Sequence, residues 1–346
     1  MELLERDALL AELEEFRKAA FDGTGCIVFV SGEAGIGKSA LANRFCAGLP
    51  AGAVVHRGFC DALRTPRALG PLYDMARSSL GELAALLDAG PDRHTLFTAL
   101  LDLLAAGPSV VLVEDVHWAD EATLDLLVFL ARRIVELPVM VAVTYRSDDV
   151  DREHPLRRVL GDLATTRAVR RLSVPPLSLT AVTALAEARD RDGAALYAVT
   201  GGNAFFVIEA LGAPTDVVPG SIRDAVLARV SRLDEAARSI VDVVSLVPVR
   251  AEIALLESRA GLDAAVRSGI LDLTEQTVGF RHELARRAVE AEVPQTVSRE
   301  LHERILEFLI GSDGVDPARL AFHADAAGDS AAVLAYAPVA GRLAGN

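Results

Sequence analysis

Short apolar runs alternate with longer segments of helical spacing over the first half of the chain. Runs rich in β-branched residues predict buried strands at residues 26–30, 53–56, 110–113, 139–144 and 169–174. Apolar residues at intervals of three and four predict helices over residues 2–20, 39–45, 69–88, 93–106 and 120–132. Strands that alternate with helices form sheets covered on both faces, so we predict a doubly wound α/β core around a parallel five-stranded sheet.

The pattern changes after the prolines at residues 175–176, which mark the end of the predicted sheet. Prolines at 214 and 219 mark a further boundary. Helical spacing then dominates, at residues 180–190, 203–212 and 282–346, with four short helices within 221–268. Residues 270–273 and 278–280 predict two short strands around a polar turn. Helices followed by a small hairpin suggest a winged helix.

The first predicted strand leads into a glycine-rich loop and then a helix. Only two of the 35 basic residues of the chain are lysines, and one of them closes this loop. Glycines let the backbone N–H groups turn inward around an anion, and the helix adds its positive N-terminal end. The lysine would bind the β- and γ-phosphate oxygens and the serine hydroxyl would reach Mg²⁺. We predict a nucleotide-binding set of Gly32, Glu33, Ala34, Gly35, Ile36, Gly37, Lys38, Ser39 and Ala40.

Two acidic residues, Glu114 and Asp115, follow the third predicted strand. Ligands of parallel sheets bind beyond the carboxyl ends of the strands, where these acids emerge. One acid would hold Mg²⁺ and the other would orient the attacking water; we favour Asp115 as the metal ligand, together with Ser39. The alternative is that the pair caps the helix predicted over residues 120–132.

An arginine, Arg146, stands at the end of the fourth predicted strand. At this edge of the sheet it would sense the γ-phosphate or stabilise charge during phosphoryl transfer, so we predict a catalytic set of Glu114, Asp115 and Arg146. The alternative is an ordinary surface arginine.

Composition narrows the class of protein. The 346 residues are 51% hydrophobic and 24% charged, which is typical of globular domains. A formal net charge of −14 argues against direct DNA binding by this chain, because phosphate neutralisation supplies most non-specific affinity. Polar residues interrupt the most apolar stretch, residues 99–116, and the N-terminus is acidic. We therefore expect no membrane association, no secretory signal and a cytoplasmic location. The three cysteines have no close pairing, which indicates neither disulfides nor a zinc site.

Several motifs together resemble the signal-transduction ATPases with numerous domains (STAND), an AAA+-like class, and within it the large ATP-binding regulators of the LuxR type. They are the loop over residues 32–39, Glu114-Asp115-Val116-His117-Trp118-Ala119-Asp120, Thr144-Tyr145-Arg146, residues 200–206 and Phe280-Arg281-His282-Glu283-Leu284. The resemblance covers nearly the whole chain, and the run that begins at Glu114 is its most specific part.

The resemblance implies a P-loop ATPase core over residues 1–175, a helical lid over 176–218, a winged helix over 219–292 and the start of a helical repeat region over 293–346. It also implies a module that is closed with ADP bound and open with ATP bound. An inducer or regulatory protein would trigger the exchange of ADP for ATP, and the ATP state would self-associate. His282 resembles the histidine that reads the ADP β-phosphate; the alternative is a histidine that caps a helix. Ala204 stands where the family often has a proline that packs on the adenine.

These observations lead us to expect a regulatory switch that binds ATP and ADP and hydrolyses ATP slowly with Mg²⁺. Alternatives are a scaffold that holds ADP without turnover, the ATPase module of a cyclase-linked signalling protein, and, less in keeping with the helices after residue 219, a small-molecule kinase. The basic helix-turn-helix of LuxR-type proteins is not found in this sequence. Because no strong terminating element precedes Asn346, we also expect the native protein to continue.

Overall fold

The computed structural model describes residues 3–61, 68–78, 80–89, 92–214, 217–312 and 314–344. The chain divides into two compact units. Unit 1 comprises residues 1–185 and 202–205, and unit 2 comprises residues 186–201 and 206–346. The predicted domain limits at residues 175, 218 and 292 stay predictions.

Unit 1 is built around a five-stranded sheet in the order β2-β3-β4-β1-β5. Its strands are β1 (Cys26–Gly32), β2 (Val54–Phe59), β3 (Ser109–Glu114), β4 (Val139–Arg146) and β5 (Val169–Ser173). Every neighbouring pair is parallel, so all five carboxyl ends lie at one edge. The prediction of a parallel five-stranded sheet is confirmed.

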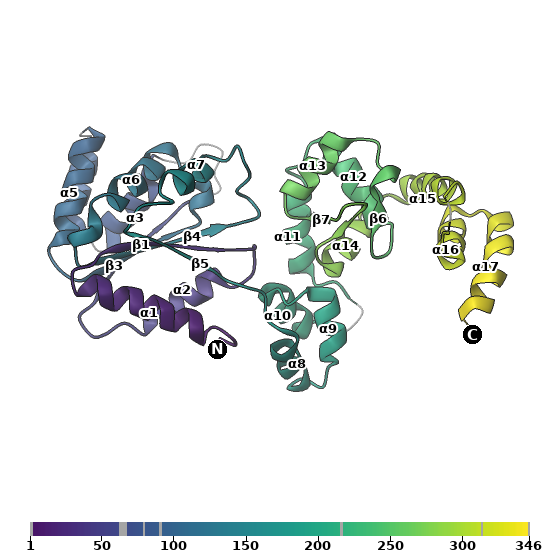
Figure 1. Cartoon of the computed structure of the whole chain (residues 1–346), viewed down its shortest axis with the longest axis horizontal. Coiled ribbons are helices and arrows are strands. Elements are labelled where there is room, and N and C mark those ends of the chain that lie inside the picture. The colour runs from purple at the N-terminus through teal and green to yellow at the C-terminus, as the bar shows by residue number, and fades with distance from the viewer. Residues whose placement is uncertain are drawn as a thin grey trace. The chain divides into compact units, whose positions relative to one another are not determined.

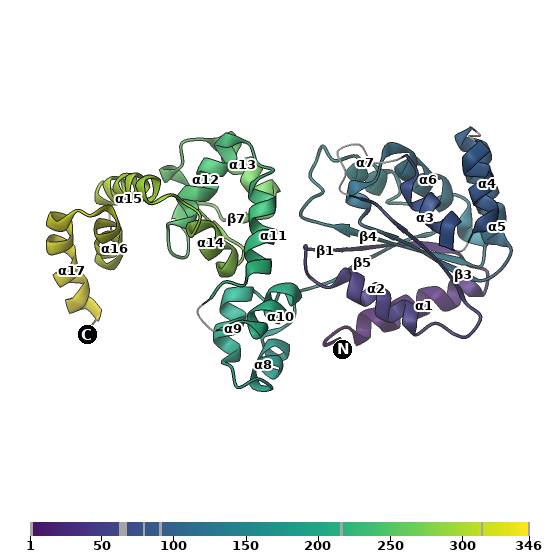
Figure 2. The ribbon, with the colours of Figure 1, turned by 180° about the vertical axis from the view of Figure 1, so that it is seen from behind.

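Helices cover both faces of this sheet (Figures 1 and 2). On one face Val28 and Leu112 pack with α1 (Asp7–Phe21) and α2 (Lys38–Ala47). On the other, Phe29 and Val111 pack with α3 (Gly70–Ser78), α5 (Arg93–Ala105), α6 (Glu121–Ala131) and α7 (Pro155–Asp162). Successive residues of a strand point to opposite faces, so a sheet buried on both sides needs the continuous apolar runs seen in the sequence.

The single helix predicted over residues 69–88 is wrong. Two helices stand there, α3 and α4 (Gly81–Ala89). The N–H of Leu80 donates to the carbonyl of Met75, five residues back, so the regular helical hydrogen-bond pattern stops at this point. Gly81, a poor helix former, begins the second helix.

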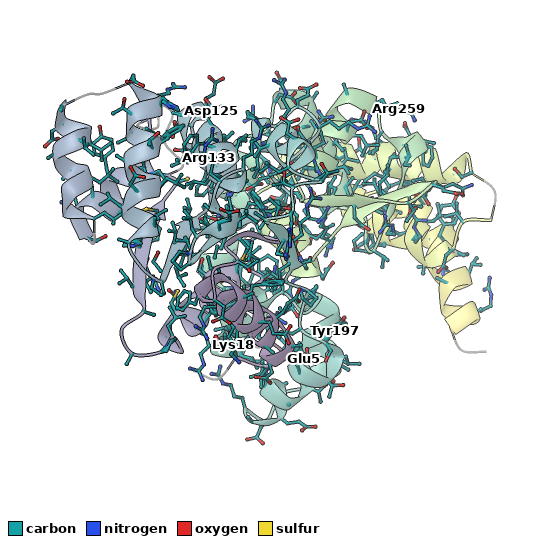
Figure 3. All side chains as sticks on the ribbon, turned by 60° about the vertical axis from the view of Figure 1, so that its left-hand side comes forward. Glu5, Lys18, Asp125, Arg133, Tyr197 and Arg259 are labelled. Atoms are coloured by element: carbon teal, nitrogen blue, oxygen red, sulfur yellow. The ribbon has the colours of Figure 1, made fainter. Side chains whose placement is uncertain are left out.

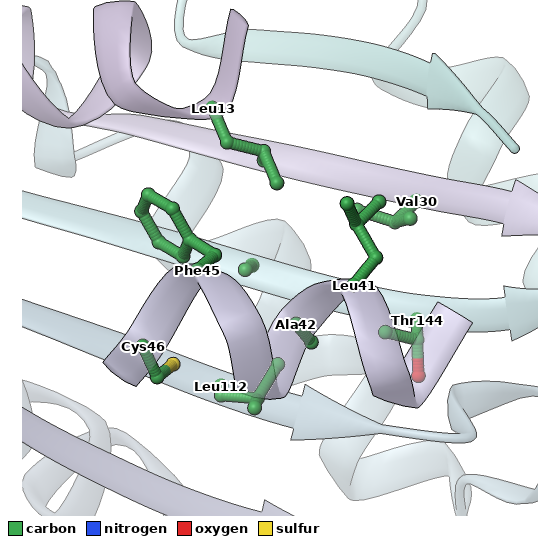
Figure 4. Close-up of a pocket in the computed structure, with 9 residues that line it drawn as sticks. Leu13, Val30, Leu41, Ala42, Phe45, Cys46, Leu112 and Thr144 are labelled. Carbon is green, nitrogen blue, oxygen red and sulfur yellow. The ribbon is translucent and has the colours of Figure 1, made fainter. Parts of the chain in front are cut away.

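Apolar packing fixes α2 on the sheet. Figure 4 shows a small cavity between this helix, α1 and the strands. The described residues that line it carry no charge; they are Leu13, Val30, Leu41, Ala42, Phe45, Cys46, Leu112, Ala142 and Thr144. This cavity belongs to the hydrophobic core, and the packing around it seats α2 and therefore the loop that precedes it.

Polar contacts complete unit 1. Lys18 on α1 and Asp125 on α6 are largely exposed (Figure 3). The Glu5 carboxylate accepts a hydrogen bond from the Ser178 N–H at 2.8 Å, and the Arg6 guanidinium donates to the Pro175 carbonyl at 2.8 Å. The segment after β5 is thus tied to the start of the chain, which explains why unit 1 extends beyond the proline pair.

Unit 2 is mainly helical. α8 (Leu179–Glu187) lies mostly in unit 1, α9 (Gly193–Thr200) lies in unit 2, and α10 (Ala204–Gly212) lies in unit 2 except for its first two residues; α9 was not predicted. A small antiparallel sheet, in the order β6-β8-β7, contains the two predicted short strands, β7 (Leu271–Leu273) and β8 (Thr277–Phe280), and one unpredicted strand, β6 (Ala251–Glu252). The remaining helices are α11 (Gly220–Val230), α12 (Glu235–Ser245), α13 (Arg259–Arg267), α14 (Glu283–Glu290), α15 (Gln295–Ile310), α16 (Pro317–Ala327) and α17 (Ser330–Ala344).

Residues 221–268 thus contain three α-helices and a 3₁₀ turn at Ile253–Leu255 in place of four short helices. None of the helices in the described residues is long and apolar enough to cross a membrane.

Candidate functional site

The glycine-rich loop joins the end of β1 to the start of α2. Gly35 and Gly37 have φ angles of +76° and +103°, a region that L side chains rarely adopt. Ser39 and Ala40 are exposed in the first turn of α2, while Ile36 is buried in the core. The positive φ angles explain why this loop needs glycines, and the helix that follows presents its N-terminal N–H groups to an anion.

Lys38 is the first residue of α2, and only 7% of its surface is exposed. Its Nζ donates to the carbonyls of Gly32 and Glu33, both at 2.9 Å. Burial lowers the pKa of this ammonium, whereas the nearby carboxylates of Asp148 and Asp115 raise it. The lysine is therefore held over the loop by two carbonyls, and the acidic groups around it offset part of the cost of burying its charge.

The segment from Gly202 to Phe205, which forms part of unit 1, packs against the same loop. Asn203 is buried, and its Nδ2 donates to the Ala34 carbonyl at 2.9 Å. The Phe205 N–H donates to the Gly35 carbonyl at 3.0 Å. These two hydrogen bonds fix the backbone of the phosphate loop at Ala34 and Gly35. The sequence did not predict this role for the segment.

Glu114 is the last residue of β3 and is 6% exposed, and Asp115 follows it. Asp115 has a φ of +58°, rare for a residue other than glycine, and its N–H donates to the Thr144 hydroxyl of β4 at 3.0 Å. Burial raises the pKa of the Asp115 carboxyl, while Arg146 and Lys38 lower it. The capping alternative is wrong, because Asp120 caps α6 by accepting the Thr123 N–H at 3.1 Å.

Arg146 ends β4 opposite Gly32 of β1, and the next N–H, of Ser147, donates to the Gly32 carbonyl at 3.2 Å. Its Nη1 lies 3.5 Å from Oδ2 of Asp149, and its Cζ lies 4.7 Å from the centre of the Trp118 ring. The indole ring and the carboxylate together fix the position of the guanidinium. The alternative of an ordinary surface arginine does not fit this environment.

His117, between the acid pair and Trp118, has no exposed side-chain surface. Its Nε2 lies 3.5 Å from Oδ2 of Asp149, and its Nδ1 lies 3.8 Å from Oδ1 of Asp115. Burial, followed by the positive charges of Arg146 and Lys38, lowers its pKa to about 3. The imidazole is therefore neutral at physiological pH and stands between the two carboxylates.

His154 holds the backbone beside this imidazole. Its Nδ1 accepts the Leu156 N–H at 3.1 Å, so its Nε2 carries the proton and donates to the His117 carbonyl at 3.0 Å. Sequence reasoning missed His154 and the acids Asp148 and Asp149. The acids had a usable signal, since they follow a strand end as Glu114 and Asp115 do.

The arrangement fits a nucleotide with Mg²⁺. In the described residues, no group of three or more histidine, cysteine or acidic side chains is arranged to hold a metal by itself. Mg²⁺ is commonly held by one or two carboxylates together with substrate phosphates. Asp115, partly exposed at the strand end, and the exposed Ser39 hydroxyl are suitable donors for that kind of site.

His282 lies in unit 2, at the N-cap position of α14. Its side chain makes no capping hydrogen bond, so the capping alternative is wrong. The ring stands edge-on to Phe206 with the ring centres 4.8 Å apart, close to Gly201. Its predicted contact with the nucleotide stays a prediction.

Comparison with known proteins agrees with this geometry. Residues 2–142 match the AAA ATPase domain family. The match covers the glycine-rich loop, the acid pair and most of the parallel sheet. A Walker-type ATPase of Pyrococcus abyssi has a similar structure, with a TM-score of 0.56, 14% sequence identity and coverage of 83% of this chain and 96% of that one. At this identity the likeness shows the fold alone, and that fold is the one of P-loop NTPases.

Two other proteins are also similar to this chain. A STAND protein of Pyrococcus horikoshii with a tetratricopeptide repeat sensor is 16% identical to this chain. The superposition covers 94% of this chain and 49% of that protein, with a TM-score of only 0.41. An uncharacterised protein of Rhizobium meliloti (strain 1021) is 25% identical over 409 residues. That alignment covers 94% of this chain, which spans 39% of the length of that relative.

Proposed function

We propose that this chain is a regulatory switch that binds ATP and ADP and hydrolyses ATP slowly with Mg²⁺. One observation carries the proposal: a single edge of the parallel sheet holds the glycine-rich loop with Lys38, the acid pair at the end of β3 and Arg146 at the end of β4. These are the groups that phosphoryl transfer uses to bind phosphates, hold a metal and stabilise charge.

Each residue has a definite role in this proposal. The loop N–H groups and Lys38 bind the β- and γ-phosphates, while Ser39 and Asp115 hold Mg²⁺. The metal, when bound, neutralises charge on the phosphate oxygens. Glu114 orients the attacking water and Arg146 contacts the γ-phosphate. Catalysis of this kind consists of positioning and charge stabilisation, because the protein forms no covalent bond.

We further propose that the chain is the ATPase module of a LuxR-type transcriptional regulator in the cytoplasm. Residues 176–218 would act as the lid, 219–292 as a winged helix with His282 on the ADP β-phosphate, and 293–346 as the start of a repeat region. ADP would keep the module closed, and exchange for ATP, prompted by an inducer or regulatory protein, would favour self-association. The net charge of −14 makes direct binding of DNA by this chain unfavourable.

A second candidate function is a scaffold that holds ADP and does not turn over ATP. The burial of Glu114 favours it, since a residue that orients water must reach that water, and Glu114 is only 6% exposed. The two candidates share the nucleotide site and differ only in hydrolysis.

Phosphate release from ATP with Mg²⁺ separates the two candidates. The switch predicts slow release that Glu114→Gln and Asp115→Asn each reduce on the order of 100-fold, in keeping with loss of a group that acts in proton transfer or metal binding. Phosphate release at the rate of the protein-free reaction, with ADP still bound tightly, would instead support the scaffold. Lys38→Met should weaken nucleotide binding on the order of 100-fold in both cases.

A further inference from the structure

Three side chains form a tilted stack beside the end of β4, with the planes of the His117 and Trp118 rings 42° apart. The rings of His117 and Trp118 have their centres 4.4 Å apart, and the guanidinium of Arg146 lies 4.7 Å from the centre of the Trp118 ring. Asp149 contacts both ends of this stack, with Oδ2 at 3.5 Å from Arg146 Nη1 and at 3.5 Å from His117 Nε2. Phosphate binding by the loop and metal binding by the acids, as proposed above, do not involve these contacts.

The charges of this stack single out Asp149. The His117 side chain is fully buried, and its Nε2 lies 3.5 Å from Oδ2 of Asp149, so the ring packs against this carboxylate. Arg146 supplies the positive charge, and both members of the Arg146–Asp149 pair are partly shielded, with side chains 25% and 22% exposed. An arginine held by one carboxylate has to weaken that contact before it can bind a second anion in the same manner.

We propose that Asp149 is a positioning residue of the nucleotide site, which holds Arg146 on Trp118 and competes with the γ-phosphate for its guanidinium. ADP lacks the γ-phosphate and leaves this contact intact, whereas ATP draws Arg146 away. Asp149 thereby weakens ATP binding relative to ADP binding and favours the ADP state. The inference rests on the proposed function, since it requires that the loop binds nucleotide and that Arg146 faces the γ-phosphate.

The test measures the dissociation constants of ATP and ADP, with Mg²⁺, for the wild-type chain and for Asp149→Asn. Loss of the competing carboxylate should tighten ATP binding by about twofold to fivefold, as expected for a partly exposed ion pair, with ADP binding unchanged. Asp149→Glu keeps the charge and should restore the wild-type ratio of the two constants. A matched control is Asp125→Asn, which removes a carboxylate 3.2 Å from Arg93 on the exposed side of α6 and should change neither constant.

A second readout uses the single tryptophan of the chain, Trp118. ATP should shift its fluorescence emission as the guanidinium leaves the ring, ADP should not, and Arg146→Ala should abolish the difference. This measurement needs only the wild type and one variant, so it stands even if the Asp149 variants do not fold.

Equal Trp118 emission with ATP and ADP, or weaker ATP binding in Asp149→Asn, would overturn the inference and leave the nucleotide site in place. Failure of the wild-type chain to bind either nucleotide would overturn the proposed function itself.

Discussion

Replacement of Gly35 by alanine is expected to disturb the phosphate loop by two separate effects. The φ of +76° is unfavourable for any residue with a Cβ, by about 1–2 kcal/mol. The new Cβ would also stand 2.8 Å from Cβ of Phe205 and 3.0 Å from Oδ1 of Asn203. The backbone fixes the Phe205 Cβ, and the Asn203 Oδ1 is held because it accepts the Phe205 N–H at 3.2 Å. Overpacking therefore adds about 1–3 kcal/mol.

Gly52 offers a matched control within the same unit. Its φ is +91°, and a Cβ built on it meets nothing within 4 Å. Gly52→Ala therefore tests the backbone term alone, at about 1–2 kcal/mol, without the contacts to the segment from Gly202 to Phe205.

The assay is urea unfolding of both variants and the wild type without added nucleotide, followed by calorimetric ADP binding. Gly35→Ala should lose about 1–3 kcal/mol more free energy of unfolding than Gly52→Ala, with an unchanged m-value, and should also bind ADP more weakly. Equal stability of the two variants would refute the close contact between the loop and Phe205.

Three other predictions concern separate parts of the molecule. Lys38→Met should weaken ATP and ADP binding on the order of 100-fold while far-ultraviolet circular dichroism stays unchanged; retained affinity would remove the lysine from the site. Asp120→Ala should lower the free energy of unfolding by about 1–2 kcal/mol through loss of the α6 cap and of the hydrogen bond from the Leu69 N–H, without changing nucleotide affinity, and a loss of affinity would contradict this structural role. Burial lowers the pKa of His323 to about 4, and its Nδ1 lies 2.8 Å from that of His302, so the unfolded chain binds protons more readily. Stability should be full above about pH 6.5 and fall by up to about 3 kcal/mol as the pH drops towards 4, and His323→Leu should flatten that slope in pH-dependent urea unfolding.

The parallel sheet could be predicted because its strands are buried on both faces. Continuous apolar runs such as Val110–Val113 leave little ambiguity when turn residues flank them. The loop ending at Lys38 was predictable for a related reason, since its chemistry depends on residues adjacent in the sequence. The AAA ATPase domain match over residues 2–142 agrees with both.

The rest of the site depends on contacts between distant segments. Asn203 reaches the loop carbonyl of Ala34 across 169 positions of the chain, and no local pattern indicates such a partner. Asp149 and His117 come together only because β3 and β4 are neighbours in the sheet, a strand order that the sequence did not specify. The split into α3 and α4 was missed because helical spacing continues across the break at Leu80.

We expect the edge of the sheet around Lys38 to be a nucleotide site that holds ADP in the resting protein. The most direct measurement is to denature the purified chain, identify any released nucleotide by chromatography and determine its amount per chain. We expect close to one ADP per chain. No released nucleotide, together with failure to bind added ATP or ADP in the presence of Mg²⁺, would contradict it.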